Sequence, residues 1–284
     1  MKYLLLLALF GNFFLFNSCK KYKPAPAAFF IKPSLVSVAT TGTTQGTANH
    51  KITDLYLYVG GKFQGAYQTG NIMPIVTNNK NVTIDIFAGI KNNGIKEASI
   101  TWLFYDKIEF DTLVENGKTI NRPLTFKYNP GVQFVWLENF EGNGFSLIKS
   151  NTGAGSDTTF KIASPGDTFE GSRSIELGLT GNGNVAQLET AIYYTLPKGN
   201  TNVYLEINYK CTAVFEVGVT DGLYLKSALN VNAQPNWNKI YIQLADAVNR
   251  APSPNQHKIY FRMIKPNDND NPRVWLDNIK LIYL

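Results

Sequence analysis

Hydrophobic and polar residues alternate in short runs along almost the whole chain. The run Leu55–Val59 is followed by Gly60-Gly61, and Lys62–Tyr67 then continues the alternation. Two glycines between such runs are a common signal for a β-hairpin. Val82–Ala88 also alternates, which is typical of a strand with one buried and one exposed face. No window between residues 34 and 130 has the 3.6-residue period of a helix, so this part is predicted to be β.

A second stretch with the same alternation follows the turn formers Asn129-Pro130-Gly131, where we place a domain boundary. Gly, Asn, Pro and Asp separate its short apolar runs, and only residues 244–249 suggest a helical turn. Many short strands at such spacing are typical of a two-sheet sandwich or a jelly roll. The sequence therefore predicts an all-β chain, with a small N-terminal β-sandwich over residues 34–130 and a C-terminal β-jelly roll over residues 131–284.

Two segments of the second domain share one pattern. Residues 135–140 read VWLENF near its start, and residues 274–279 read VWLDNI near its end. The first and last strands of a closed sandwich commonly lie side by side, because this removes a free edge. We therefore expect the two segments to pair, and Trp136 and Trp275 to supply large core or interface surface.

The first 18 residues are predicted to be a secretory signal peptide. A lysine precedes the apolar stretch Tyr3–Phe16, which is too short for a membrane-spanning helix. The stretch ends in LFNSC, which resembles the lipobox of bacterial lipoproteins, with Asn17 where Ala or Ser is more usual. The resemblance implies cleavage before Cys19 and lipid on its thiol, which would hold the protein on a membrane by its acyl chains. The alternative is an ordinary signal peptide with an incidental cysteine.

Residues 19–33 are predicted to form a lipidated tether, because their prolines favour an extended spacer. Residues 1–33 hold five lysines and no acidic residue, so the formal net charge of +6 leaves about +1 for residues 34–284. A nearly neutral body lacks the basic patch that phosphate binding needs, so nucleic acid is excluded as a partner. In lipoproteins of the Bacteroidetes, acidic residues after the lipid cysteine often mark the surface side of the outer membrane. The basic stretch here favours the periplasmic side without deciding it.

Both domains resemble known families. Residues 55–67, 73–75 and 88–95 resemble the PEGA-type β domains of Bacteroidetes envelope lipoproteins, with Gly60 where Asp is common. That resemblance implies a fold and an envelope setting, with no known chemistry. The second domain resembles the jelly-roll, galactose-binding-like superfamily of carbohydrate-binding modules. Three motifs carry the second resemblance: Asn139–Gly142, Phe169–Leu177 and Trp275–Leu281.

The second resemblance implies a structural calcium ion. In such modules calcium often joins the start of the domain to its last strand, and the ion needs several oxygen ligands. The candidate ligands are Glu141, Glu138 and Asp277, with a backbone carbonyl near Gly171. The alternative is that these carboxylates are solvated. The acidic run Asn267–Asn271 lacks the glycine and the distal glutamate of an EF-hand, so we expect a solvated loop there.

Catalytic motifs are not found in the sequence. The two histidines, His50 and His257, show no metal-binding spacing to a second histidine or a cysteine. Neither a nucleophile elbow nor a phosphate-binding loop is present. We therefore expect a protein that is not an enzyme. A glycoside hydrolase or lyase is kept as a third alternative, because its paired carboxylates come together only in space.

Ligand binding is the remaining chemistry. Sugars stack on exposed aromatic rings while polar side chains bind their hydroxyls. The candidates are Tyr194, Tyr224 and Trp237, with Arg262 as a polar partner. Adjacent residues of a strand face opposite sides, so at most one of Tyr193 and Tyr194 lines a given surface. The prediction is a membrane-anchored envelope lipoprotein that binds a polysaccharide without catalysis; the alternative is a structural component that docks another envelope protein.

Overall fold

The computed structural model describes residues 27–157, 160–179, 182–267 and 271–284. The signal peptide and Cys19 lie outside these residues. Strands dominate the described chain, from β1 (Ala27–Ala39) to β20 (Arg273–Tyr283), and the helices among them are the short α2 (Gly42–Gln45) and α3 (Ala245–Arg250). The predicted all-β fold class is confirmed. Among the described residues, no helix is both long enough and apolar enough to cross a membrane.

The N-terminal domain is a sandwich of two sheets. Its three-stranded sheet has the order β4-β1-β8, in which β1 is antiparallel to β4 and parallel to β8. Its five-stranded sheet has the order β3-β2-β5-β6, with β7 also paired to β5. The core between them includes Leu57, Ile84, Trp102 and Phe126. The strands are β2 (Asp54–Val59), β3 (Lys62–Gln68), β4 (Met73–Thr77), β5 (Asn81–Lys91), β6 (Ser99–Thr101), β7 (Ile108–Leu113) and β8 (Thr119–Lys127).

The first domain begins earlier than the sequence indicated. Residues 27–33 were expected to belong to the tether, but they form the first half of the central strand β1. Phe29 and Ile31 point into the core and are fully buried, so alternation, rather than the Pro and Ala content, decides the structure here. The pairing of β1 with β8 shifts register between Pro33 and Leu35, which is where a strand tolerates proline.

The C-terminal domain is a second, larger sandwich. One sheet, called here the β13 sheet, has the order β10-β13-β19-β16-β17 with β14 on β19; the other, called the β15 sheet, has the order β11-β12-β20-β15-β18 with β9 on β20. The strands are β9 (Gln133–Glu138), β10 (Leu147–Lys149), β11 (Phe160–Ile162), β12 (Ile175–Gly178), β13 (Val185–Thr190), β14 (Tyr194–Thr195), β15 (Val203–Cys211), β16 (Phe215–Thr220), β17 (Leu225–Val231), β18 (Gln234–Gln243) and β19 (Gln256–Ile264).

The first and last strands of this domain pair as expected. β9 lies antiparallel to β20, with Trp136 opposite Leu281. Trp136 is buried in the core between the two sheets. Trp275 lies on the outer face of the β15 sheet instead, because its neighbours Val274 and Leu276 point inward.

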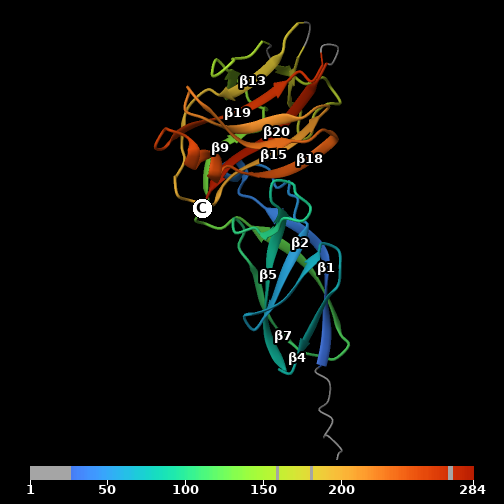
Figure 1. Ribbon diagram of the computed structural model, residues 1–284. Coiled ribbons are helices and arrows are strands. Elements are labelled where there is room, and N and C mark those ends of the chain that lie inside the picture. Colours follow the sequence, from blue (N-terminus) through green and yellow to red (C-terminus); the bar gives the residue numbers. More distant parts are fainter. Residues whose placement is uncertain (1–26, 158–159, 180–181, 268–270) are drawn as a thin grey trace, which may run out of the picture.

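The outer face of the β15 sheet is also the surface on which the N-terminal domain sits, and Figure 1 shows the two domains stacked end to end. Tyr204, Tyr241 and Ile282 project from this sheet into the hydrophobic core of the N-terminal domain. The ring of Trp102 lies 4.8 Å, centroid to centroid, from the rings of both Tyr204 and Tyr241. The two domains therefore share one continuous apolar core at their junction.

A cluster of buried charges lies beside this shared core. The Glu206 carboxylate, which is fully buried, forms an ion pair of 2.8 Å with Lys239 and accepts a hydrogen bond of 3.0 Å from the Tyr128 hydroxyl. Lys280 donates to that same hydroxyl, at 3.2 Å, and to the carbonyl of Thr47. Burial would raise the pKa of Glu206, but Lys239 and Lys280 hold it below its usual value. Burial lowers the pKa of Lys280 to about 8.

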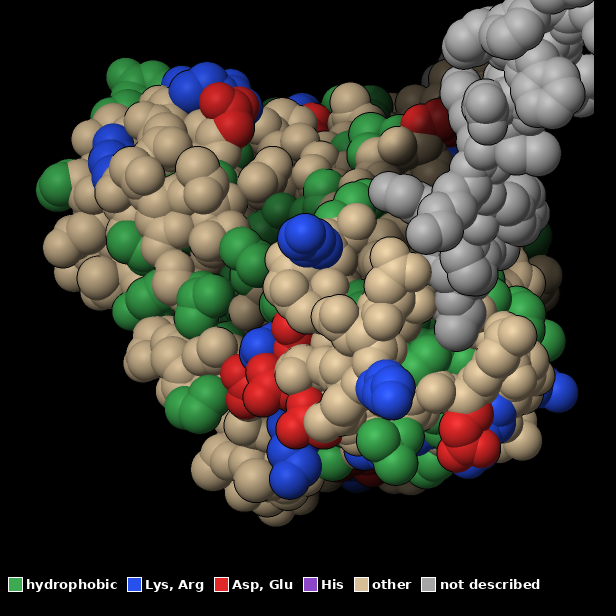
Figure 2. Space-filling view, turned by 90° about the horizontal axis from the view of Figure 1, so that it is seen from below, with side chains coloured by type: hydrophobic (Ala, Val, Ile, Leu, Met, Phe, Trp, Pro, Cys, Tyr) green, Lys and Arg blue, Asp and Glu red, His purple; other side chains and the backbone are tan. Residues whose placement is uncertain are grey.

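The charges on the remaining surface are mixed. Figure 2 views the molecule from the N-terminal end and shows basic and acidic side chains beside one another, with scattered hydrophobic side chains between them. Neither sign of charge gathers into a large patch on this face. The view agrees with a folded body whose net charge is close to zero.

Replacement of Glu206 tests how strongly the junction depends on this cluster. Glu206→Gln keeps the shape of the side chain but removes the ion-pair partner of buried Lys239 and the stronger of two acidic neighbours of Lys280, which should cost about 3–5 kcal/mol of unfolding free energy. The measurement is urea denaturation. Glu115→Gln is the matched control, because it breaks an exposed ion pair with Lys118 and should cost less than about 1 kcal/mol. Similar losses in both variants would contradict the role assigned to Glu206.

Candidate functional site

On the outer face of the β13 sheet, polar residues occupy alternate positions along the strands. Residues paired across an antiparallel sheet point to the same side, so the register defines rows of side chains on this face. The residues at the alternate positions, such as Leu188, Phe261 and Val217, fill the core. Two rows cross the outer face, the first made of Gln187, Arg262 and Glu216 and the second of Glu189, Tyr260 and Gly218.

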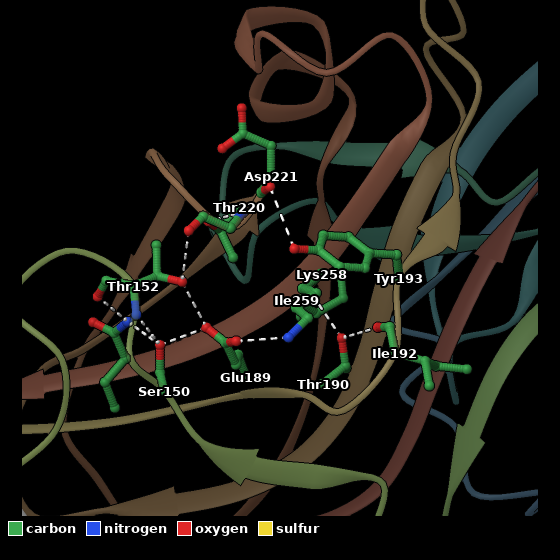
Figure 3. Close-up of polar contacts among 12 residues, drawn as sticks. Ser150, Thr152, Glu189, Thr190, Ile192, Tyr193, Thr220, Asp221, Lys258 and Ile259 are labelled. Atoms are coloured by element: carbon green, nitrogen blue, oxygen red, sulfur yellow. Dashed lines mark hydrogen bonds and ion pairs between the residues drawn. The ribbon is translucent and has the colours of Figure 1, made fainter.

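Glu189 is the centre of a buried polar network on this face (Figure 3). Its carboxylate binds the Lys258 ammonium at 2.7 Å and accepts hydrogen bonds from the hydroxyls of Ser150, at 2.5 Å, and Thr152, at 2.9 Å. Burial would raise the pKa of Glu189, but Lys258 and the two hydroxyls hold it below its usual value. The result is a charged carboxylate whose position is fixed by its partners.

Two loops meet over this network. Gln187 holds the first loop by donating to the Ser150 hydroxyl, at 2.7 Å, and to the carbonyl of Thr152, at 3.1 Å. The Thr152 hydroxyl in turn lies 3.5 Å from the carbonyl of Gly222 in the second loop. The loop after β10 therefore crosses part of the sheet and touches the turn between β16 and β17.

Two exposed tyrosines lie at the border of this part of the sheet. Tyr193, in the connection between β13 and β14, is 45% exposed, and Tyr224, in the turn between β16 and β17, is 58% exposed. The Tyr193 hydroxyl lies 3.5 Å from the carbonyl of Asp221, and the Lys258 ammonium lies 5.0 Å from the centre of the Tyr193 ring. Asp221 accepts hydrogen bonds from the backbone N–H of Leu223 and of Tyr224, which fixes the turn. We call this surface the Tyr193–Tyr224 edge.

The structure separates the predicted ligand residues. Arg262 lies on β19 of the β13 sheet and Tyr224 lies in the turn before β17 of the same sheet, but Trp237 lies on the opposite sheet, beyond the core. Tyr194 is in the core: it is 8% exposed and stacks on Trp136 with 5.9 Å between ring centroids. Tyr194 therefore cannot offer a ring face to a ligand, and burial raises its pKa to about 12. The two adjacent tyrosines do face opposite sides, and the one that faces solvent is Tyr193 and not the predicted Tyr194.

Glu189 and Lys258 were not predicted from the sequence. Charged residues inside apolar strands were the only available signal, and such residues usually point to water. Here they lie on an outer face that loops cover, so their burial depends on segments far apart in the sequence. Another polar side chain of this face is buried as well: Tyr260 is fully buried, and its hydroxyl donates to Glu216.

The three carboxylates predicted to bind calcium are each held by other donors. Glu138 accepts from the backbone N–H of Ser146, at 2.9 Å, and Glu141 accepts from that of Ser172, at 2.8 Å. Asp277 accepts from the Ser174 hydroxyl at 2.7 Å. Burial raises the pKa of Asp277 to about 6.

These contacts do not form a cation site. Among the described residues, no group of three or more acidic, histidine or cysteine side chains is placed to hold a metal ion. Glu138 and Glu141 do line a cavity of about 600 Å³, but Lys280 lines it as well. As they are placed, the residues do not fit a calcium ion, and calcium stays a prediction from the resemblance alone.

No protein-family model matches the chain, and no curated protein matches it. Among solved structures, the chain is similar to a family 11 carbohydrate-binding module of a cellulosomal cellulase of Clostridium thermocellum, at 20% identity, over 54% of this chain and 95% of that one, with a TM-score of 0.37. It is also similar to a carbohydrate-binding module of the β-sandwich superfamily, at 12% identity, over 92% and 99%, with a TM-score of 0.39. A family 30 module of a second Clostridium thermocellum cellulase matches at 19% identity, over 54% and 94%, with a TM-score of 0.32.

Substitution of Gly222 tests how tightly the Tyr193–Tyr224 edge is built. A Cβ atom on Gly222 would collide with the Tyr193 hydroxyl, whereas Gly70 has the same φ of +92° and open space around it. Both Gly222→Ala and Gly70→Ala should cost about 1–2 kcal/mol for the left-handed backbone. Gly222→Ala should cost about 1–3 kcal/mol more, because a packed ring must move. The measurement is urea denaturation of both variants, and equal losses would show that Tyr193 moves aside freely.

Proposed function

We propose that the protein is a membrane-anchored envelope lipoprotein that binds a glycan, without catalysis, at the Tyr193–Tyr224 edge. The observation that carries this proposal is the half-exposed ring of Tyr193 beside the charged pair Glu189–Lys258 (Figure 3), with the exposed Tyr224 in the adjoining turn. Sugar rings stack on such aromatic faces, and their hydroxyls bind polar side chains nearby.

Unpaired cationic groups on the same sheet support the proposal. Among the described residues, Arg262 has no hydrogen-bond or ion-pair partner, and its Nε is buried without an acceptor. Lys226 forms no ion pair with a described carboxylate, and its ammonium lies 5.8 Å from the centre of the Tyr224 ring. Both side chains can therefore donate to ligand oxygens without losing an internal partner.

The carboxylates of the face support binding rather than catalysis. Glu189 is 5% exposed and is held by Lys258, Ser150 and Thr152, so it is placed neither to protonate a leaving group nor to attack a sugar. Glu216 accepts from the Tyr260 hydroxyl. A glycosidase would need two carboxylates facing one cleft, with the reacting sugar between them.

The lipid anchor is the second part of the proposal. It rests on the lipobox-like sequence before Cys19. β1 begins at the end of the N-terminal domain that lies away from the C-terminal domain (Figure 1). Lipid on Cys19 would therefore leave the N-terminal domain between the membrane and the glycan-binding sheet.

Lipidation can be tested by metabolic labelling in a bacterial host. The full chain should incorporate a clickable fatty acid and partition into the detergent phase of Triton X-114. Cys19→Ala should lose both properties, because no acyl chain then buries itself in the bilayer. Cys211→Ala is the control, since this buried cysteine should not affect labelling. Labelling that survives in Cys19→Ala would overturn the anchor.

One further observation favours a second candidate function, the docking of an envelope protein. Two aliphatic residues at the same edge are strongly exposed, Ile192 by 60% and Leu223 by 76%. Exposed apolar patches often mark protein interfaces. A protein partner would depend on these two side chains at least as much as on the tyrosine rings.

Affinity electrophoresis through gels that contain soluble polysaccharides separates the two functions. We expect retardation by at least one polysaccharide, and Tyr224→Ala should weaken this binding about tenfold, since a lost ring contact of about 1.4 kcal/mol has that effect. Phe63→Ala is the matched control, because Phe63 is 56% exposed but lies on the N-terminal domain. Retardation that is insensitive to Tyr224→Ala and Tyr193→Ala would reject this site. Retardation by no polysaccharide in a broad panel would reject glycan binding.

A further inference from the structure

A second aromatic surface lies on the outer face of the β15 sheet. Lys210 on β15 pairs in register with Trp275 on β20. On the other side of β15, the pairing of Tyr209 with Asn238 brings Trp237 next to Lys210. The three side chains form one row across adjacent strands, with Lys210 in the middle. We call it the Trp237–Trp275 row.

Contacts within the row hold both indole rings in place. The Lys210 ammonium lies 4.6 Å from the centre of the Trp275 ring and 5.6 Å from that of the Trp237 ring. It also forms an ion pair with Asp167, which anchors the ammonium between the rings. Phe169 packs on Trp237 with 5.5 Å between ring centroids. The row is therefore a pre-formed surface rather than a set of free side chains.

The N-terminal domain does not cover this row. On β15 the outward positions are Tyr204 and Glu206 at the junction, followed by Asn208 and then Lys210, so the row lies at the other end of the same face, where Asp167 and Phe169 of the connection between β11 and β12 contact it. Both tryptophans remain partly exposed. Both indole nitrogens are buried and have no acceptor among the described residues, so a ligand would contact the rings and not the N–H groups. The row thus offers partly exposed aromatic area that its own neighbours hold rigid.

The spacing of the row identifies the kind of ligand it fits. Trp237 and Trp275 stand on strands separated by one intervening strand, so their attachment points are about 10 Å apart, twice the spacing between neighbouring strands. The centres of adjacent sugar rings lie closer together than this, so the first and third rings of an extended trisaccharide can stack one on each indole. Between them lies Lys210, whose side chain is 13% exposed and whose ammonium is held by Asp167.

We propose that the Trp237–Trp275 row is a second glycan-binding site, which takes three or more linked sugars. It lies on the opposite face of the sandwich from the Tyr193–Tyr224 edge, so one molecule can hold two glycan segments at once. Two such sites raise the overall affinity for a long polysaccharide through effective concentration, without any new contact. The row stands on its own residues and does not require that the first site binds.

Intrinsic fluorescence reports on this row selectively. The chain has four tryptophans, and Trp102 and Trp136 are buried in the two cores. A change in emission when the full chain is titrated with gluco- or manno-oligosaccharides therefore reports on Trp237 and Trp275. We expect the change with trisaccharides and longer chains, and at least about tenfold weaker binding of mono- and disaccharides, which contact one ring at a time.

Single substitutions assign the signal. Trp275→Ala should lower the affinity measured through Trp237 about tenfold or more, and Trp237→Ala should do the same through Trp275. Trp275→Phe keeps a ring at the same place and should restore most of the affinity. Urea denaturation of each variant checks that it folds. Tyr224→Ala is the control at the other site and should leave the fluorescence titration unchanged.

The outcomes distinguish this proposal from the first. If no oligosaccharide changes the emission while gel retardation depends on Tyr224, the row is not a site and the proposed function stands. If the emission changes and depends on Trp237 and Trp275 while gel retardation does not depend on Tyr224, the row binds glycan and the first site fails. An emission change that Tyr224→Ala removes and Trp237→Ala leaves intact would overturn the row.

Discussion

The buried carboxylate of Glu206, held between Lys239 and Lys280, is the constraint on which the arrangement of the two domains depends. A buried charge is costly unless its partners are in place, so the junction tolerates one docking geometry far better than any other. In that geometry the Tyr128 hydroxyl from the N-terminal domain bridges Glu206 and Lys280. The apolar contacts around Trp102 hold the two domains together, and the buried charges fix their relative position.

This docking divides the outer face of the β15 sheet. The end that carries Tyr204 and Tyr241 becomes core, and the other end keeps Trp237 and Trp275 accessible. The β13 sheet has no domain packed on its outer face among the described residues. It is covered in part by its own loops, which bury Glu189 and leave tyrosine rings at the border. The outer faces of both sheets thus carry aromatic rings beside paired charged groups, although the N-terminal domain covers part of one face and loops cover part of the other.

Most of the fold could be predicted from alternation alone, because a strand with one buried and one exposed face has apolar and polar residues at alternate positions. The pairing of β9 with β20 followed from closure of the sandwich. β1 was missed at residues 27–33, since Pro and Ala content outweighed the alternation of Phe29 and Ile31. The site was harder to predict. Which sheet carries a residue depends on the long-range pairing of strands, so Trp237 and Tyr224 could not be assigned to opposite sheets before the structure was known.

The polar groups of the β13 face and the aromatic rings have different physical roles. Glu189 and Lys258 satisfy one another, so a ligand gains little from replacing either partner. Their network instead fixes the loops that carry Tyr193 and Tyr224, which lowers the entropy that the rings lose when a sugar stacks on them. Affinity would then come from ring contacts of a few kcal/mol at most, and a binder built this way needs more than one such surface to hold a polysaccharide firmly. Rings on both outer faces of one sandwich meet that need within a single chain.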